Sequence, residues 1–152
     1  MTADPWPLLA GRLDGASHVL PVRVYFEDTD FSGIVYHGAY VRFFERGRSD
    51  FIRLLGVEHQ ALARGQHGGH LAFAVRRMTL DFRKPARIDD IIEVRSRLLT
   101  LSGVRIAIAQ SVVRSGEILV EAEVEVVLLN DAGRLSRIPA AIRSRLAAAT
   151  PD

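Results

Sequence analysis

The chain of 152 residues contains no cysteine, which excludes disulfide bonds and any metal site built on thiolates. Lysine is almost absent as well, since Lys84 is the only one among 20 basic residues and arginine supplies the rest. The arginines are spread evenly, without the basic blocks interleaved with aromatic residues that are typical of nucleic-acid-binding segments. We therefore expect no nucleic-acid partner.

Long apolar runs are also missing, so no segment is predicted to cross a membrane. The first residues carry two prolines and an early Asp4, whereas an export signal needs a basic start followed by an apolar stretch. Together these absences predict a cytoplasmic protein.

The length and composition predict one globular domain, since 48% of the residues are hydrophobic and 25% are charged. Residues 1–16 contain proline, glycine and aspartate in no periodic pattern, and we expect them to form a disordered or loosely ordered N-terminal arm. Residues 17–150 are then the single folded domain.

A long helix is predicted over residues 38–55, because apolar residues and one glycine recur there at steps of three and four. The positions on this face are Tyr40, Phe44, Gly47, Phe51 and Leu55. Gly47 costs about 1 kcal/mol of helix propensity relative to alanine, and its lack of a side chain would let the helix approach a sheet closely. Gly56 stands at the position where glycine commonly ends a helix.

Five strands are predicted from alternating apolar and polar residues. They cover residues 18–26, 71–83, 91–101, 105–114 and 118–130. The turn segments RKPAR, LSG and SGE separate the last four strands, and connections this short join antiparallel neighbours. A helical turn near residues 58–64 and a final helix between Pro139 and Pro151 complete the pattern. The order predicts an α+β fold in which a curved sheet wraps one helix, and its open edges favour a dimer.

The segment YFEDTDFSGIVYHGAY, residues 25–40, places Asp28 and Asp30 in an apolar setting directly before the long helix. No Ser, Thr, Asp or Asn stands immediately before the helix start, so free backbone N–H groups are expected at its positive end. A carboxylate facing such donors suits acyl transfer to water, because it can act as base or nucleophile while the donors stabilise an oxyanion. In the alternative interpretation, Asp28, Asp30 or Ser32 folds back to cap the helix and binds no ligand.

The segment VRVYFEDTDFSGIVYHGAYVRFFERGRSDFIRLLG resembles the opening signature of the hotdog-fold acyl-CoA thioesterases of the 4-hydroxybenzoyl-CoA thioesterase class. It is most similar to the bacterial branch associated with the Tol-Pal envelope system. The likeness continues through FAVRRMTLDFRKPARIDD, LSGVRIAIAQSVVR and EAEVEVVLLN and covers residues 18–139. It implies a hotdog fold, in which a five-stranded antiparallel sheet wraps a long central helix, assembled as a homodimer or homotetramer with active sites at the protomer interface. It also implies an acyl-CoA substrate and no cofactor or metal.

The resemblance also implies roles for individual residues. By its place in the D-T-D-x-x-G-x-V-Y-H-x-x-Y pattern, Asp30 matches the catalytic aspartate of the family, which acts as nucleophile or as general base. His37 falls where a backbone N–H of the family polarises the thioester carbonyl, and its side chain is a candidate for orienting the substrate. Gly38 would let a ligand approach the backbone, and Tyr40 would line the acyl pocket. Asp28 is assigned to structure within the turn.

Some members of the family hold the CoA phosphates with a basic cluster between the third and fourth strands. That turn is LSGVR here, where Arg105 is the only basic residue. Arg76, Arg77 and Lys84 join Arg105 as candidate phosphate contacts. The alternative for each is a cation on the surface that binds no ligand.

The alternative function is a non-catalytic hotdog module that binds acyl carrier protein or an envelope-division partner, and such a module would have no need of Asp30. His59, His67 and His70 are interpreted as loop histidines, because neither a carboxylate pattern nor helical spacing marks them as metal ligands.

Glu45 is a second carboxylate to consider, since another hotdog branch uses a helix glutamate as its catalytic carboxylate. Its position three residues before Arg48 on the predicted helix favours an ion pair between the two instead.

Overall fold

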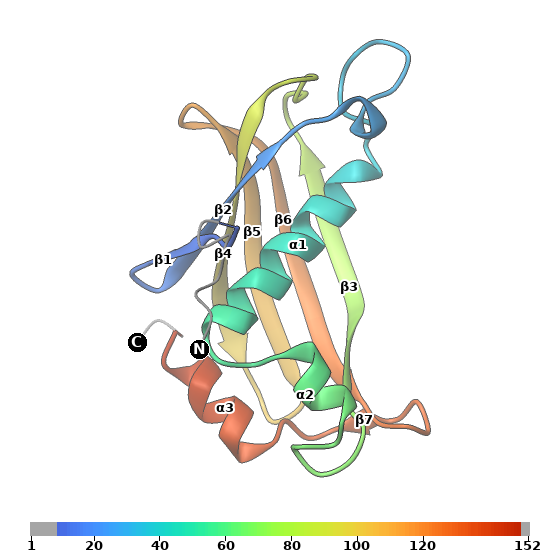
Figure 1. Ribbon diagram of the computed structural model, residues 1–152, viewed down its shortest axis with the longest axis vertical. Helices are drawn as coiled ribbons and strands as arrows, with labels where there is room; N and C mark the ends of the chain where they lie inside the picture. The colour runs from blue at the N-terminus through green and yellow to red at the C-terminus, as the bar shows by residue number, and fades with distance from the viewer. Residues whose placement is uncertain (1–8, 150–152) are drawn as a thin grey trace, which may run out of the picture.

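The computed structural model describes residues 9–149, and its main feature is one antiparallel sheet curled around one long helix (Figure 1). The strands are β1 (Arg12–Asp14), β2 (Ser17–Arg23), β3 (Ala72–Phe82), β4 (Ile91–Leu101), β5 (Arg105–Arg114), β6 (Glu117–Leu129) and β7 (Leu135–Ser136). The helices are α1 (Ala39–Leu54), α2 (His59–Ala63) and α3 (Ala140–Ala147), with a short 3₁₀ turn at Phe26–Asp28. The strands lie in the order β1-β2-β4-β5-β6-β3, and β7 pairs with β6. The predicted α+β arrangement is confirmed, with two short strands added to the five expected.

Helix α1 crosses the inner face of the sheet, and its apolar side chains form the centre of the core (Figure 1). At Gly47 an added Cβ would lie 2.6 Å from Cγ1 of Val94 and 3.3 Å from Nε2 of Gln110. The helix therefore lies too close to β4 and β5 for any side chain at this position, as predicted. The helix ends just before Gly56, whose φ of +92° is the left-handed conformation that glycine adopts without strain.

The start of the described chain is more ordered than predicted. Arg12–Asp14 forms β1, which pairs antiparallel with β2, and the Gly11 N–H donates to Oδ2 of Asp50 at 2.8 Å. The expected loosely ordered arm over residues 1–16 therefore differs from the structure at residues 11–14, because a hydrogen bond to α1 and a strand pairing hold them. Residues 1–8 lie outside the described part of the chain.

The connection RKPAR does not join neighbouring strands, so this part of the predicted topology is wrong. β3 pairs with β6, while β4 pairs with β2 and β5. Residues 83–90 instead cross to the other side of the sheet, and their backbone is hydrogen-bonded to the segment before α1. The Val35 N–H donates to the Ala86 carbonyl and the Val24 N–H donates to the Asp90 carbonyl, each at 2.9 Å. These long-range bonds are the physical reason for the crossing, and they brace the acidic segment.

Asp50 is the centre of a buried polar cluster beneath the far end of α1. Its Oδ2 accepts from Nε2 of His18 at 2.6 Å as well as from Gly11, and its Oδ1 accepts from Arg53 at 2.5 Å. The His18 ring is fully buried and stacks on Phe51 with centroids 5.4 Å apart. The cluster therefore fastens β1 and β2 to α1.

Within residues 9–149, none of the helices has the length and apolar character needed to cross a bilayer.

Candidate active site

Asp28 holds the acidic segment together from within. The residue is 5% exposed, and its Oδ2 accepts from the Tyr25 N–H at 2.9 Å. Its backbone carbonyl accepts from the Tyr36 N–H at 2.9 Å. Asp28 thus joins the entry and the exit of the turn, which confirms the structural role predicted for it.

Asp30 lies at the exposed corner of the same turn. The chain reverses there because Gly33, with φ of +79°, lets its N–H donate to the Asp30 carbonyl while the Asp30 N–H donates to that of Ile34. Oδ1 of Asp30 accepts from Oγ of Ser32 at 2.6 Å and from the Ser32 N–H at 2.8 Å. The hydroxyl bond first, and then the backbone bond, hold the pKa of Asp30 below its ordinary value of 3.8.

The Asp30 side chain is therefore a carboxylate at neutral pH, and one of its oxygens is oriented by Ser32. Within residues 9–149 its other oxygen, Oδ2, has no hydrogen-bond partner. This oxygen is available to a substrate or to a water molecule.

The N-terminus of α1 is open. Gly38 stands at the cap position, and no described side chain caps the helix. The alternative in which Asp28, Asp30 or Ser32 caps this helix is therefore wrong, because none of their side chains accepts from a backbone N–H of its first turn, and the contact of Asp28 with α1 is to the Arg42 guanidinium at 3.8 Å.

Backbone donors without an acceptor remain at this helix tip. The Tyr36 N–H donates to Asp28 and the Ala39 N–H to the Tyr36 carbonyl, but within residues 9–149 those of His37 and Gly38 have no acceptor. Both lie at the positive end of a 16-residue helix, where an oxyanion or a polarised carbonyl is stabilised.

Gly38 keeps this tip accessible to a ligand. A Cβ built on it would lie 2.7 Å from Cε1 of Tyr36, so a side chain would displace the Tyr36 ring. The His37 ring is exposed and contacts the Tyr36 ring at a centroid distance of 4.4 Å and the Phe82 ring at 6.4 Å. His37 therefore offers an exposed aromatic side chain and a free backbone donor side by side.

Tyr40 lies one turn into α1 and is only 3% exposed. Its hydroxyl accepts from the Ala86 N–H at 3.0 Å, and burial raises the pKa of the Tyr40 phenol above its ordinary value. Its ring contacts the Phe82 ring at 5.7 Å. In one protomer Tyr40 thus anchors residues 83–90 to the helix tip, and its predicted role in lining an acyl pocket stays a prediction.

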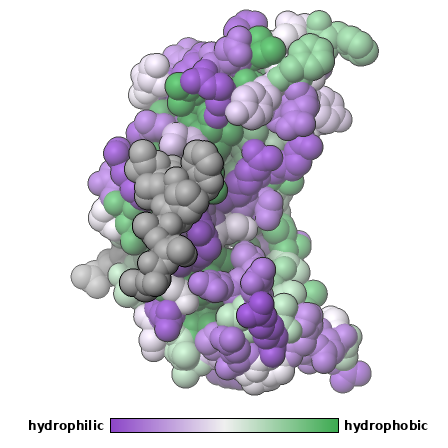
Figure 2. All heavy atoms as spheres, in the orientation of Figure 1, coloured by the Kyte–Doolittle hydropathy of each residue, from purple (hydrophilic) through white to green (hydrophobic). Residues whose placement is uncertain are grey.

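Exposed aromatic rings surround the acidic turn. They belong to Tyr25, Phe26, Phe31, Tyr36 and Phe82, and Phe31 stands fully in solvent next to Asp30. Figure 2 shows hydrophobic residues gathered at the top of the molecule, over the loop that precedes α1. So many exposed rings around a carboxylate are unusual for a surface that stays in contact with solvent. They indicate that a ligand or another chain covers them.

The predicted phosphate contacts fall into two places. Arg76 donates to Glu125 at 2.9 Å, and Arg105 lies 3.4 Å from the same carboxylate. Arg76 stands six residues before Phe82 on β3, which is about 20 Å along an extended strand. In one protomer Arg76 and Arg105 are therefore remote from the helix tip.

Lys84 and Arg77 differ from those two. Lys84 follows Phe82 at the end of β3 near the helix tip, and its Nζ bonds to Glu117 at 2.8 Å. Arg77 is exposed, and within residues 9–149 it has no ion-pair partner. The candidate cations do not form one cluster.

A hollow of about 140 Å³ opens between α1 and the sheet. Most of its lining is apolar, and its polar members are Glu45, Arg48, Ser49 and His59. The predicted Glu45–Arg48 ion pair is wrong: Glu45 accepts from the Ser49 hydroxyl at 3.3 Å, while Arg48 turns inward and donates to Gln110 at 3.1 Å. Arg48 is 8% exposed, because Gln110 on β5 gives its guanidinium a buried acceptor that the spacing along the helix does not reveal.

The histidines of the α1–β3 connection make packing contacts. The His59 ring meets the Phe73 ring edge-on at 5.6 Å, and Nδ1 of His70 bonds to the Ala63 carbonyl at 2.8 Å. Within residues 9–149 no three histidine or acidic side chains form a group that could hold a metal ion.

Neither the ring of exposed aromatic residues nor the hollow beside α1 was predicted from the sequence. The aromatic residues are visible in the sequence as apolar side chains placed inside turn chemistry, where a core position is not expected. The hollow is lined by residues of α1, α2, β3, β5 and β6, so only the fold reveals it.

Comparison with known proteins identifies the family of this chain. The model of the thioesterase-like superfamily matches residues 24–146. The chain is 40% identical over 111 residues to the "Acyl-CoA thioester hydrolase YbgC" of Escherichia coli O6:H1, covering 72% of this chain and 80% of that protein. It is 36% identical over 118 residues to the "Acyl-CoA thioesterase YbgC" of Haemophilus influenzae, covering 78% and 84%.

A solved structure agrees. The probable thioesterase from Bartonella henselae superposes with a TM-score of 0.79 at 43% identity, covering 81% of this chain and 99% of that one. The matched family model covers the acidic turn, α1 and all the strands from β3 to β7. The chain belongs to the thioesterase-like superfamily and is a thioesterase of the hotdog fold.

Proposed function

We propose that this thioesterase hydrolyses an acyl-CoA thioester to a free acid and CoA at the open tip of α1. The observation that carries the proposal is the pairing of an ionised Asp30, which has one unengaged oxygen, with the unpartnered N–H groups of His37 and Gly38. The acyl-CoA named for the E. coli and H. influenzae relatives supports the substrate class.

In the proposed reaction, the thioester carbonyl oxygen accepts a hydrogen bond from the His37 N–H, and the positive end of α1 stabilises the charge that grows on it. Asp30 then acts in one of two ways. As nucleophile it forms an acyl anhydride and expels the CoA thiolate, and water hydrolyses the anhydride. As general base it takes a proton from a water molecule that attacks the carbonyl carbon, and the CoA thiolate then leaves and takes up that proton. Neither route calls for a metal or a prosthetic group.

A second copy of the chain completes the site in this proposal. β3 pairs with β6 on one side only, so its other edge carries unpaired backbone groups. If two copies pair their β3 edges antiparallel about Met78, the Phe82 end of one lies beside Phe73 of the other. The hollow next to α1, which Phe73 lines, then adjoins the partner's acidic turn and can receive the acyl group. Arg76 and Arg77 come within reach of the partner's CoA, and the aromatic rings are covered.

The finer placement of the protein rests on the resemblance of its opening segment. We infer that it lies in the 4-hydroxybenzoyl-CoA thioesterase class, in the branch associated with the Tol-Pal system, and that it works in the cytoplasm as a homodimer or homotetramer. Acyl carrier protein is a second candidate for the acyl donor, since it presents the same thioester.

The test is thiol release from short, branched, aromatic and long acyl-CoAs, and from acyl carrier protein loaded with the same acyl groups. Asp30→Asn should lower kcat by at least about a hundredfold, as expected for loss of a catalytic carboxylate. Glu27→Gln is the matched control, because Glu27 is an exposed acid of the same segment without a hydrogen bond among the described residues. Equal rates for Asp30→Asn and the parent on every substrate would overturn the proposed role of Asp30. The absence of thiol release by the parent itself would favour the non-catalytic module.

A further inference from the structure

Arg48 is a buried cation that takes no part in the reaction described above. The residue is 8% exposed, and its Nη1 donates to Oε1 of Gln110 at 3.1 Å. Within residues 9–149 this is the one hydrogen bond of its guanidinium, and no carboxylate there forms an ion pair with it. Glu45 acts on it through space, without a bond. A buried charge without a paired counter-ion costs free energy, which a ligand of opposite charge would offset.

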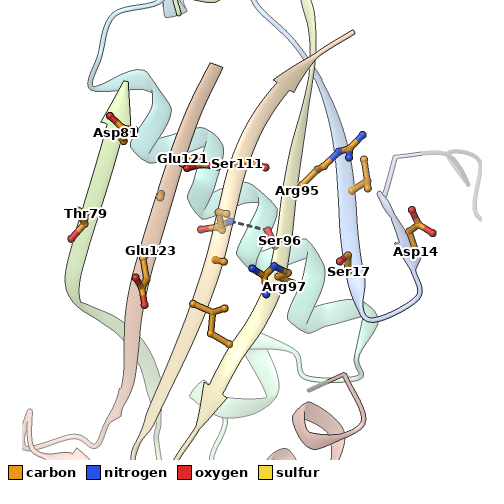
Figure 3. A pocket seen from close by; sticks show the side chains of 15 residues that line it. Asp14, Ser17, Thr79, Asp81, Arg95, Ser96, Arg97, Ser111, Glu121 and Glu123 are labelled. Atoms are coloured by element: carbon orange, nitrogen blue, oxygen red, sulfur yellow. Dashed lines mark hydrogen bonds between the residues drawn. The ribbon is translucent and has the colours of Figure 1, made fainter. Parts of the chain in front are cut away.

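Gln110 fixes the direction of this guanidinium. Nε2 of Gln110 donates to the Phe44 carbonyl at 2.9 Å and to the Ser96 hydroxyl at 2.8 Å, and the second of these bonds is the dashed line in Figure 3. Both donors of the amide are therefore engaged, and its oxygen is turned toward Arg48. Since Gln110 is neutral, it orients the cation without balancing its charge.

Two nitrogens of Arg48, Nε and Nη2, are open to the hollow next to α1. Arg48 lines this hollow, and Gln110 engages only Nη1. Within residues 9–149, Nδ1 of His18 is the one fully buried side-chain nitrogen or oxygen that lacks a partner. Nε and Nη2 of Arg48 are therefore not sealed inside the protein, and their N–H groups can donate to a ligand in the hollow.

The rest of the hollow suits a short apolar chain. Glu45 is exposed and accepts from Ser49, which places it toward the mouth, whereas the buried Arg48 lies toward the inner end. At about 30 Å³ for each water-sized group, the volume of about 140 Å³ holds about four or five non-hydrogen atoms. The apolar walls are the Phe73 ring and the aliphatic side chains of Ile52, Val75, Ile106, Ile108 and Val126.

We propose that this thioesterase acts on acyl-CoAs whose short acyl chain ends in a carboxylate, and that Arg48 binds this carboxylate at the inner end of the hollow. The inference rests on the proposed function, in which the hollow receives the acyl group. A succinyl group fits this space, because two methylenes and a carboxylate follow its thioester carbonyl. The methylenes contact the aliphatic walls, and the carboxylate accepts charge-assisted hydrogen bonds from Nε and Nη2 of Arg48.

The test compares thiol release from succinyl-CoA and from 4-methylpentanoyl-CoA, each corrected for release without protein. The two acyl groups have nearly the same size and shape, and only the first ends in a charge. The parent should hydrolyse succinyl-CoA with a kcat/KM at least about tenfold higher, as expected for a charge-assisted pair. The difference should lie mainly in KM, because a carboxylate remote from the reacting carbon is bound equally in the ground state and the transition state.

Variants at position 48 assign the preference to the guanidinium. Arg48→Met keeps an unbranched stem and removes the charge, so the preference for succinyl-CoA should disappear. Arg48→Lys keeps a charge and should retain a preference of the same sign. Arg46→Met is the matched control, because Arg46 is exposed on the same helix and makes no hydrogen bond or ion pair among the described residues. It should keep the parent preference.

Either of two results would overturn this inference and leave the thioesterase reaction standing. One is a parent that hydrolyses 4-methylpentanoyl-CoA as efficiently as succinyl-CoA, and the other is an Arg48→Met variant that keeps the preference. A parent that releases thiol from no acyl-CoA would instead overturn the proposed function and this inference together. Because the first comparison needs no variant, misfolding of Arg48→Met cannot hide the outcome.

Discussion

Replacing Asp50 by alanine should destabilise the fold without touching the candidate active site. The substitution removes the acceptor of the buried His18 ring and of the Gly11 N–H, at 2.6 and 2.8 Å. A hydrogen bond to a charged group contributes about 1.5–3 kcal/mol, and the Asp50 carboxylate accepts one from His18 and one from Gly11. The Arg53 contact adds little, because the Arg53 side chain is half exposed. We expect the free energy of unfolding to fall by about 3–5 kcal/mol.

Urea denaturation followed by far-UV circular dichroism measures this change. The midpoint should fall while the slope of the transition stays unchanged, because the surface exposed on unfolding is the same. Asp131→Ala, in the exposed turn after β6, is the control and should change stability by no more than about 0.5 kcal/mol. A loss of less than about 1 kcal/mol in Asp50→Ala would refute the idea that this cluster fastens β1 and β2 to α1.

The same carboxylate sets a pH dependence. Burial acts to raise the pKa of Asp50, but hydrogen bonds from His18, Gly11 and Arg53 outweigh it and hold the pKa below 3.8. A carboxyl group whose pKa is lowered on folding stabilises the fold at pH above its unfolded pKa, and this contribution is lost as pH falls through the folded pKa. The stability difference between parent and Asp50→Ala should therefore shrink on acidification. A stability difference that stays constant as the pH falls through and below 3.8 would contradict the stabilising role of the ionised Asp50.

Three further predictions concern the helix tip. Ser32→Ala removes the hydroxyl that lowers the pKa of Asp30, so the acidic limb of its kcat/KM profile should move to higher pH, and an unmoved limb would contradict this. Gly38→Ala should lower kcat/KM by at least about tenfold while stability is retained, because its Cβ displaces the Tyr36 ring that lies beside the helix tip, and parent-like activity would contradict the geometry. His37→Ala keeps the backbone donor, so kcat should fall by less than about tenfold, and a loss as large as that of Asp30→Asn would move the role to the imidazole.

Periodicity in the sequence was sufficient to predict the long elements of the fold, but not the short strands β1 and β7. The strands at 91–101 and 105–114 agree with β4 and β5 at both ends, and α1 is one residue shorter at each end than predicted. The close approach at Gly47 was predictable because a glycine on an otherwise apolar stripe has few other uses. The place of β3 was not predictable from its short link to β4, since the decisive hydrogen bonds reach back to Val24 and Val35.

Contacts between distant segments were also hidden. Nothing in the spacing of α1 shows that Arg48 turns inward, because its acceptor, Gln110, lies 62 residues further along the chain. The same holds for the bond between His18 and Asp50, which are 32 residues apart. For the candidate site the sequence supplied the residue types and the uncapped helix start. Which backbone donors are free depended on the hydrogen bonds of Tyr36 and Ala39.

The two aspartates of the acidic turn show how one short segment separates structure from chemistry. They are two residues apart and chemically identical, yet Asp28 is buried with its carboxylate and carbonyl both bonded to backbone N–H groups of the turn. That bonding fixes the path of the chain, and the path leaves Asp30 at the exposed corner, where Ser32 binds only one of its oxygens. Replacing Asp28 by asparagine would weaken the hydrogen bonding that holds the turn. The same replacement at Asp30 would leave the turn intact and remove the charge. Loss of stability should therefore follow substitution of Asp28, and loss of turnover substitution of Asp30, although the same change is made in both.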